Sequence, residues 1–290
     1  MTNNDILISS STRKSVNLFI KSPSHALIIL GPVGSGRTSV AKLIAKELIG
    51  ANQNPSEQIG NIKSIGDSKN SVGIDEIREL KTFFRLKSTG AAKINRVATI
   101  HADNISDEAQ NSLLKLLEEP PLNSLIILTA SSENSLRPTI LSRSQKLFIS
   151  RPSQELAVEH FSKLGKSKDD IVKTYLLSNG NMGLMSSILS SDSESELVGY
   201  VEDAKKILKS TRLSKLAMID EMVKDKEHLS DRLYALKRVT HAAMKQSIQG
   251  SSSKSAKAWY HRLNALNDAE IMLNTNVNIK LTLTNLFLNL

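Results

Sequence analysis

The sequence contains no cysteine, few aromatic residues and no long apolar run. Without cysteine there can be no disulfides and no thiolate-held zinc or iron–sulfur site, which fits a reducing compartment such as the cytoplasm. Aromatic residues make up 4% of the 290 residues, which argues against stacking platforms for single-stranded nucleic acid. No stretch approaches the ~18 apolar residues of a membrane span, and the first five residues carry no basic targeting segment. We expect a soluble, cytoplasmic protein without zinc or a membrane partner.

Positive charge is in excess, and most of that excess lies in the last third of the chain. The formal net charge is +9, and residues 201–290 contain 15 Lys and Arg against 9 Asp and Glu. This bias suits a polyanionic partner such as DNA. The solvated helical surface of any basic protein would have the same composition, so both interpretations stay open.

Apolar runs alternate with helical patterns over the first 150 residues. Strands are predicted at Ala26–Leu30 and at residues 96–100, 125–129 and 147–149, and helices at residues 38–48, 72–80 and 107–119. This alternation predicts a parallel α/β sheet with helices on both faces. From Ser153 onward only helical patterns occur, first in a compact unit to residue 189, then, after a polar hinge at residues 190–195, in a set of amphipathic helices.

Residues 31–38 read GPVGSGRT, which is the phosphate-loop pattern G-x-x-x-x-G-K-[ST] with arginine in place of lysine. The candidate nucleotide-binding residues are Gly31, Gly34, Gly36, Arg37 and Thr38. Glycines let backbone N–H groups curl around phosphate, and the following helix adds the positive end of its dipole. A planar guanidinium is not equivalent to the compact lysine ammonium at such a site, so affinity for nucleotide should be reduced. We expect no required cofactor, and weak binding of ATP or ADP stays open.

An active phosphate-loop enzyme also needs a carboxylate at the end of a neighbouring strand, to hold magnesium and to orient water. The candidate strand ends at Ile100 and His101, and the first carboxylate, Asp103, follows only in the loop. His101 would be a poor substitute base. We therefore predict no protein-held metal and very slow hydrolysis of ATP.

Several further strings occur together in this chain. They read HAL at residues 25–27, GIDEIR at 73–78, NSLLKLLEEPP at 111–121, RPTILSRSQ at 137–145 and TNVNIKL at 275–281. In this combination the sequence resembles, nearly end to end, the bacterial clamp-loader family of AAA+ proteins. The resemblance implies a P-loop AAA+ core over residues 1–151, a small helical lid over 152–195 and an all-α helical collar for oligomerisation over 196–290.

The resemblance also implies partners and one site residue. Proteins of this family assemble with other clamp-loader subunits into a hetero-oligomeric ring, which loads the sliding clamp onto primed DNA during DNA replication. The family's Ser-Arg-Cys string supplies an arginine finger to the ATP site of a neighbouring subunit, and Arg143 stands at that place. Ser144 replaces the cysteine. The alternative for Arg143 is a salt-bridged surface arginine.

Three departures from the family pattern favour a subunit without ATPase activity of its own. The zinc-binding cysteines that many relatives carry are absent from residues 50–61, Leu184 stands where a phosphate-sensing arginine is expected, and the catalytic acids are missing. Such a protein would be an accessory subunit of a DNA polymerase. Two alternatives stay open: an ATP-hydrolysing motor subunit of the same ring, and a non-replicative AAA+ adaptor.

Overall fold

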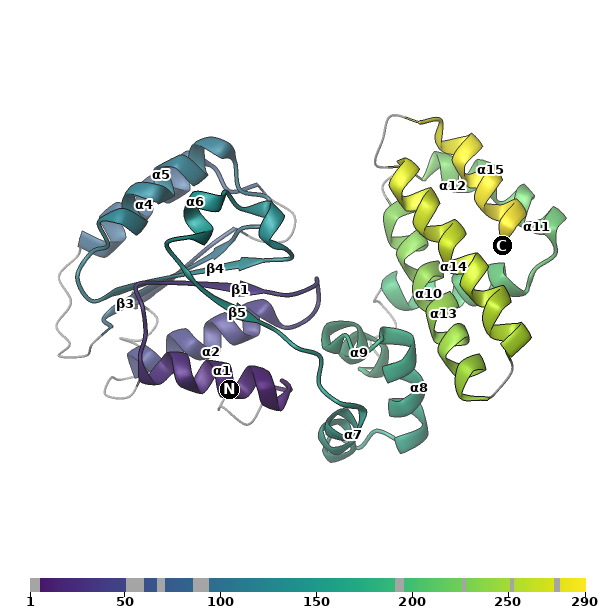
Figure 1. The fold of residues 1–290 in the computed structure, drawn as a ribbon, viewed down its shortest axis with the longest axis horizontal. Helices are drawn as coiled ribbons and strands as arrows, with labels where there is room; N and C mark the ends of the chain where they lie inside the picture. The colour runs from purple at the N-terminus through teal and green to yellow at the C-terminus, as the bar shows by residue number, and fades with distance from the viewer. Residues whose placement is uncertain are drawn as a thin grey trace. The chain divides into compact units, whose positions relative to one another are not determined.

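The computed structural model describes residues 6–50, 60–66, 71–85, 94–190, 196–225, 228–250, 253–273 and 277–290. The chain divides into two compact units, Met1–Leu156 and Ala157–Leu290 (Figure 1). Most of the expected linker at residues 50–61 and of the hinge at 190–195 lies outside the described residues.

The first unit is an α/β unit built around one parallel sheet. Its elements are α1 (Ser10–Lys21), β1 (Ala26–Leu30), α2 (Arg37–Gly50), β2 (Ile62–Ile65), α4 (Ile74–Arg85), β3 (Arg96–His101), α5 (Asp107–Glu118), β4 (Ser124–Ala130), η1 (Glu133–Ser135), α6 (Pro138–Leu141) and β5 (Gln145–Phe148). The strand order is β2-β3-β4-β1-β5, and every neighbouring pair is parallel. The strands β3, β4 and β1 are neighbours and parallel, so the loops that follow them lie side by side at the carboxyl end of the sheet.

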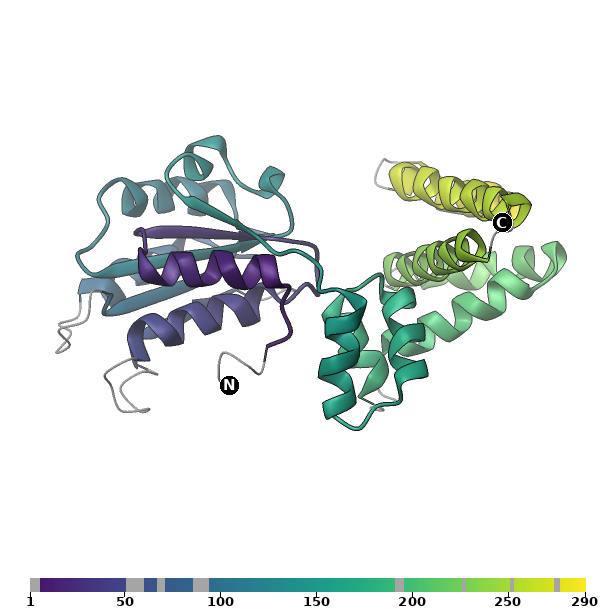
Figure 2. The ribbon, with the colours of Figure 1, turned by 60° about the horizontal axis from the view of Figure 1, so that its bottom comes forward.

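Helices cover both faces of the sheet, as predicted, with α4, α5 and α6 on one side and α1 and α2 on the other (Figures 1 and 2). Successive side chains of a strand point to opposite faces. Ile28 of β1 accordingly packs in the cluster that contains Leu80 and Leu113. Its neighbour Leu27 packs in the other cluster, with Phe19. Strands buried on both sides explain the continuous apolar runs in the sequence.

The start and end of α5 follow from its sequence. The Ser106 hydroxyl accepts a hydrogen bond from the Ala109 N–H at 3.2 Å, and acidic side chains occupy the first turn. The helix ends at Glu118, just before the two prolines that cannot continue it. The helix packs against α6, and Glu118 in its last turn forms an ion pair with Arg143.

Every element that the structure describes in the second unit is a helix. It contains α7 (Gln154–Lys163), α8 (Lys168–Ser178), α9 (Met182–Leu189), α10 (Glu196–Lys209), α11 (Arg212–Ala217), α12 (Ile219–Lys224), α13 (Leu229–Gln249), α14 (Ser253–Leu273) and α15 (Ile279–Asn289), of which α7 begins just before the boundary. A core with Leu236, Leu266 and Phe287 joins α13, α14 and α15. The division into a lid over 152–195 and a collar over 196–290 stays a prediction. Within the described part of the chain, no helix could cross a membrane.

Gly66, directly after β2, generates a test of this fold. Its φ is +72°, and a Cβ at this position would lie 2.5 Å from Val72 Cγ2, whereas Gly165 has a φ of +78° and open space around it. Both Gly→Ala substitutions force alanine into the left-handed region, at roughly 1–2 kcal/mol, and only Gly66→Ala adds a clash. We expect the larger loss of stability for Gly66→Ala, measured by urea denaturation. Equal losses would show that the packing around Val72 adjusts freely.

Candidate functional site

The phosphate loop connects β1 to α2 and has the backbone geometry that its glycines predict. Gly34 and Gly36 have φ of +77° and +90°, in the region that favours glycine. At Gly31 a Cβ would lie only 2.8 Å from Ser35 Oγ. Thr38 is exposed in the first turn of α2. The predicted glycines thus lie in the loop, and Arg37 and Thr38 begin the helix that follows it.

Arg37 begins α2, and its guanidinium forms a bidentate pair with the carboxylate of Asp103. Nη1 donates to Oδ1 at 3.2 Å, and Nη2 donates to Oδ2 at 2.8 Å. The Arg37 side chain is 6% exposed and that of Asp103 is 16% exposed. A planar fork on a carboxylate, largely shielded from water, is the geometry in which such pairs are strongest.

Asp103 has two further neighbours. Its Oδ1 accepts a hydrogen bond from the backbone N–H of Ser131, just beyond β4, and its Oδ2 lies 3.6 Å from His101 Nε2. Burial raises the pKa of Asp103, but hydrogen bonds from Arg37 and Ser131 outweigh it, so the pKa lies below the ordinary 3.8. Asp103 is therefore ionised at neutral pH, and it joins the segments that follow β1, β3 and β4.

The sequence identified both partners separately but not their pairing. Arg37 stood out as a departure from the phosphate-loop pattern, and Asp103 as a carboxylate displaced beyond its strand. An arginine in place of the loop lysine and an acid two residues beyond β3 both follow strands of the predicted sheet. This indicates that they lie near the same end of the sheet, but the pairing itself depends on the strand order.

Arg143 lies just after α6, and its polar contacts are with α5 and α6. Nη1 donates to the Thr139 carbonyl at 3.1 Å, and Nη2 forms an ion pair with Glu118 Oε1 at 3.0 Å. The two side chains are 38% and 50% exposed. The structure thus places Arg143 at the surface in an ion pair with Glu118, which is the arrangement of the alternative interpretation, a salt-bridged surface arginine.

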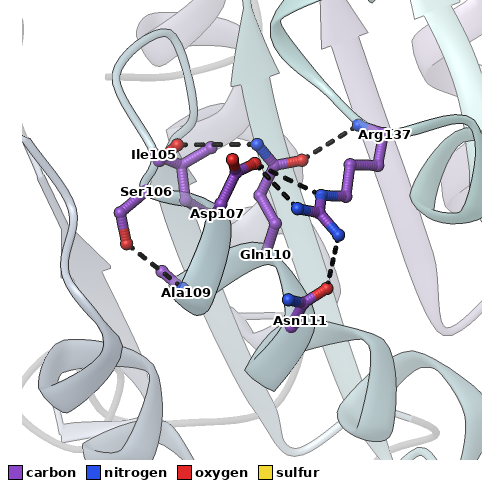
Figure 3. A network of polar contacts seen from close by, with 7 residues as sticks. All are labelled: Ile105, Ser106, Asp107, Ala109, Gln110, Asn111 and Arg137. Atoms are coloured by element: carbon purple, nitrogen blue, oxygen red, sulfur yellow. Dashed lines mark hydrogen bonds and ion pairs between the residues drawn. The ribbon is translucent and has the colours of Figure 1, made fainter.

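Arg137 differs from Arg143, because it is tied to α5 at several points (Figure 3). Its Nη1 donates to Asn111 Oδ1 at 2.7 Å, and its Nε donates to Asp107 Oδ1 at 3.3 Å. Its backbone N–H donates to Oε1 of the buried Gln110 at 2.9 Å. This network fixes the chain where α6 begins, which is a structural role.

Comparisons with known proteins find similar sequences among subunits of DNA polymerase III and of replication factor C. A family model described as DNA polymerase III, delta subunit, matches residues 15–153. DNA polymerase III subunit tau of Bacillus subtilis is 29% identical over 161 residues, which are 51% of this chain and 28% of that protein. DNA polymerase III subunit delta' of Haemophilus influenzae is 31% identical over 139 residues, 48% of this chain and 40% of that protein.

A longer match is to replication factor C small subunit 1 of Pyrobaculum islandicum. It is 28% identical over 232 residues, which are 74% of this chain and 68% of that protein. By contrast, the chain spans less than half of the tau and delta' proteins that it matches. The matches to these two proteins are 161 and 139 residues long, against 232 for the replication factor C subunit.

We predict that Asp103→Asn destabilises the first unit by roughly 2–4 kcal/mol, because the amide leaves the buried Arg37 without its ionic partner. In the unchanged protein, the lowered pKa of Asp103 contributes stability at every pH above the pKa of this group in the unfolded chain, about 3.9. This contribution disappears as the pH falls through the folded pKa, and the variant lacks that dependence. Urea denaturation followed by circular dichroism measures both effects. The fluorescence of Trp259, which belongs to the second unit, separates the two transitions.

The matched control is Asp75→Asn, which removes the exposed ion pair with Arg78 at 2.9 Å. The Asp75 side chain is 86% exposed, so its loss should change stability by no more than about 1 kcal/mol. If both variants lose the same stability, the Arg37–Asp103 pair is no more than a surface contact.

Proposed function

Because the chain belongs to the clamp-loader family of AAA+ proteins, we propose that it is a non-hydrolysing subunit of a bacterial replicative clamp loader, comparable in role to delta'. With the other subunits of a ring it would help to load a sliding clamp onto primed DNA in the cytoplasm. It would also present Arg143 to the ATP site of a neighbouring subunit.

The Arg37–Asp103 ion pair is the observation that supports a subunit without ATP hydrolysis of its own. In an active phosphate loop the lysine reaches the β- and γ-phosphates, and a carboxylate of a neighbouring strand holds magnesium. Here the cation at the lysine position and the first carboxylate after β3 neutralise each other at 2.8 Å. A magnesium nucleotide would have to separate this shielded pair before either group could serve it. Weak nucleotide binding is compatible with this arrangement, and efficient turnover is not.

Two other positions support a subunit without hydrolysis. His101 offers an imidazole at the end of β3, where an active enzyme has its acid, and it lies 3.6 Å from Asp103. Leu184, at the position expected for a phosphate-sensing arginine, is a buried apolar residue of α9. A motor subunit of the same ring would need a free cation and a free carboxylate at the sheet edge. A non-replicative adaptor is disfavoured by the replication subunits among the relatives.

The contacts of Arg143 support its proposed role in trans. An arginine fork can grip two phosphate oxygens at once, which suits charge that develops during phosphoryl transfer. A half-exposed ion pair such as Arg143–Glu118 is worth only about 0–1 kcal/mol, so release toward a neighbouring subunit costs little. Arg137 is held by several contacts to α5 and is not free in this way.

We predict negligible ATPase activity for the isolated protein, measured at steady state with magnesium. Arg37→Lys alone should not create turnover, because the strand that ends at His101 still lacks its carboxylate. The control is Thr38→Ala, which removes the exposed hydroxyl of the loop. A turnover typical of motor subunits that disappears in Thr38→Ala would contradict the proposal.

We further predict that Arg143→Ala leaves the protein folded and the ring assembled, but slows hydrolysis at the neighbouring ATP site. Removing a finger in trans lowers the rate by about 10³–10⁵-fold. Arg143→Lys should restore only part of the rate, since the lysine ammonium is a point charge and cannot bind two phosphate oxygens as the planar guanidinium does. The measurement is single-turnover hydrolysis by the reconstituted ring.

Glu118→Gln is the matched control for Arg143, because it removes the resting ion pair and keeps the guanidinium. Its turnover should match or exceed that of the unchanged ring. An unchanged rate for Arg143→Ala, in rings shown to contain the variant, would leave Arg143 as a salt-bridged surface residue.

A further inference from the structure

A groove runs between α14 and α15 in the second unit, where the two helices pack side by side (Figure 1). Its volume is about 430 Å³, within the range of roughly 300–1,000 Å³ that is usual for ligand pockets. The residues that line it recur every three or four positions, so they form one face of each helix. Ala269 is buried and Ala265 half-buried in this lining, and their short side chains leave space that longer ones would fill.

Asp268 on α14 gives the groove its charge. Among the described residues that line it, no other is Asp, Glu, Lys or Arg. The Asp268 side chain is exposed, and within the described part of the chain its carboxylate has no ion pair or hydrogen bond. Glu270, two residues later, is instead paired with Lys237 of α13. An unpaired carboxylate in a groove, in a part of the chain with excess positive charge, indicates a binding place for a cation.

Two further side chains of the groove have their hydrogen atoms engaged, so they can offer only oxygen to a ligand. Thr282 Oγ1 donates to the Asn278 carbonyl at 3.1 Å. Asn289 Nδ2 donates to the Asn285 carbonyl at 2.8 Å and to Asn285 Oδ1 at 3.2 Å. Thr282 Oγ1 and Asn289 Oδ1 therefore add acceptors to the carboxylate of Asp268. A cation with several N–H donors complements this set of oxygens.

We propose that this groove binds an arginine side chain of a partner protein. The guanidinium is planar, always charged and has five N–H donors, so it can pair with Asp268 and still donate to neighbouring oxygens. A lysine ammonium has three donors and is more strongly hydrated, which makes it the weaker ligand here. The groove is built from other elements than the phosphate loop and Arg143, and the proposal does not rest on the function proposed above.

The surroundings of the groove favour an arginine on a protein over a free small cation. Met272 lines the groove and is exposed. Leu281 and Leu288 are also exposed, and they lie one turn before and one turn after Asn285 on the surface of α15. Arginine surrounded by apolar contacts is a common centre of protein interfaces. The carboxylate of Asp268 repels the phosphates of a nucleic acid, so the basic composition of this region does not extend to the groove.

The experiment uses the full chain and the peptide acetyl-Ala-Leu-Arg-Leu-Ala-amide, titrated at low salt. Two comparison peptides carry lysine, or citrulline with its neutral urea group, in place of the arginine. The side-chain amide signals of Asn264 and Asn285, which both line the groove, report binding there by NMR. These signals should shift with the arginine peptide. The citrulline peptide should bind about tenfold or more weakly, as expected for the loss of a charge-assisted hydrogen bond, and the lysine peptide should lie between the two.

Asp268→Asn keeps the size of the side chain and changes an exposed position, so it should leave the fold intact. It should weaken binding of the arginine peptide by about tenfold or more. Asp268→Glu keeps a carboxylate and should retain part of the affinity. The matched control is Asp169→Asn, an exposed position of α8 outside the groove, which changes the net charge equally and should leave binding almost unchanged.

Each contrary result would overturn the proposal. Equal affinity for the citrulline peptide would mean that the groove does not recognise a guanidinium, and equal affinity for the lysine peptide would mean that it takes any cation. Equal weakening by Asp268→Asn and Asp169→Asn would reduce the binding to an effect of net charge. If the amide signals of Asn264 and Asn285 do not shift, the peptide does not bind in the groove.

Discussion

The ion pair between Arg37 and Asp103 is the contact on which the carboxyl edge of the sheet depends. It connects the loop after β1 to the loop after β3, and the Ser131 N–H adds the segment after β4. In a working phosphate-loop enzyme, nucleotide and magnesium make these connections. Here two side chains of the same protein supply both charges, and the loop keeps its glycine-dependent shape.

The two arginines after β4 show how similar residues take different roles through their surroundings. Arg137 is held by Asp107, Asn111 and the backbone contact with Gln110, so that its side chain is part of the framework (Figure 3). Arg143 has the Thr139 carbonyl, the Ser142 hydroxyl and one half-exposed carboxylate as partners. Removing a framework contact disturbs folding, whereas a weakly held guanidinium at the surface can exchange partners.

The strands with continuous apolar runs were predictable, because burial on both faces leaves little room for polar residues. β2 was not predicted: Ile62–Ile65 is a four-residue edge strand with only one fully buried residue, so its sequence does not differ from a loop. The phosphate loop was evident from its glycines. The Arg37–Asp103 pair joins residues 66 positions apart, and it depends on strand order and side-chain direction, which no local pattern encodes.

At the phosphate loop of this protein, the carboxylate of Asp103 neutralises Arg37 in the absence of nucleotide. Both side chains of the Arg37–Asp103 pair belong to the chain itself, so the pair forms without a bound nucleotide. Under the function proposed above, this subunit would keep that contact while neighbouring subunits bind and release nucleotide. It would then be the part of the ring that stays fixed while the subunits that hydrolyse ATP move relative to it.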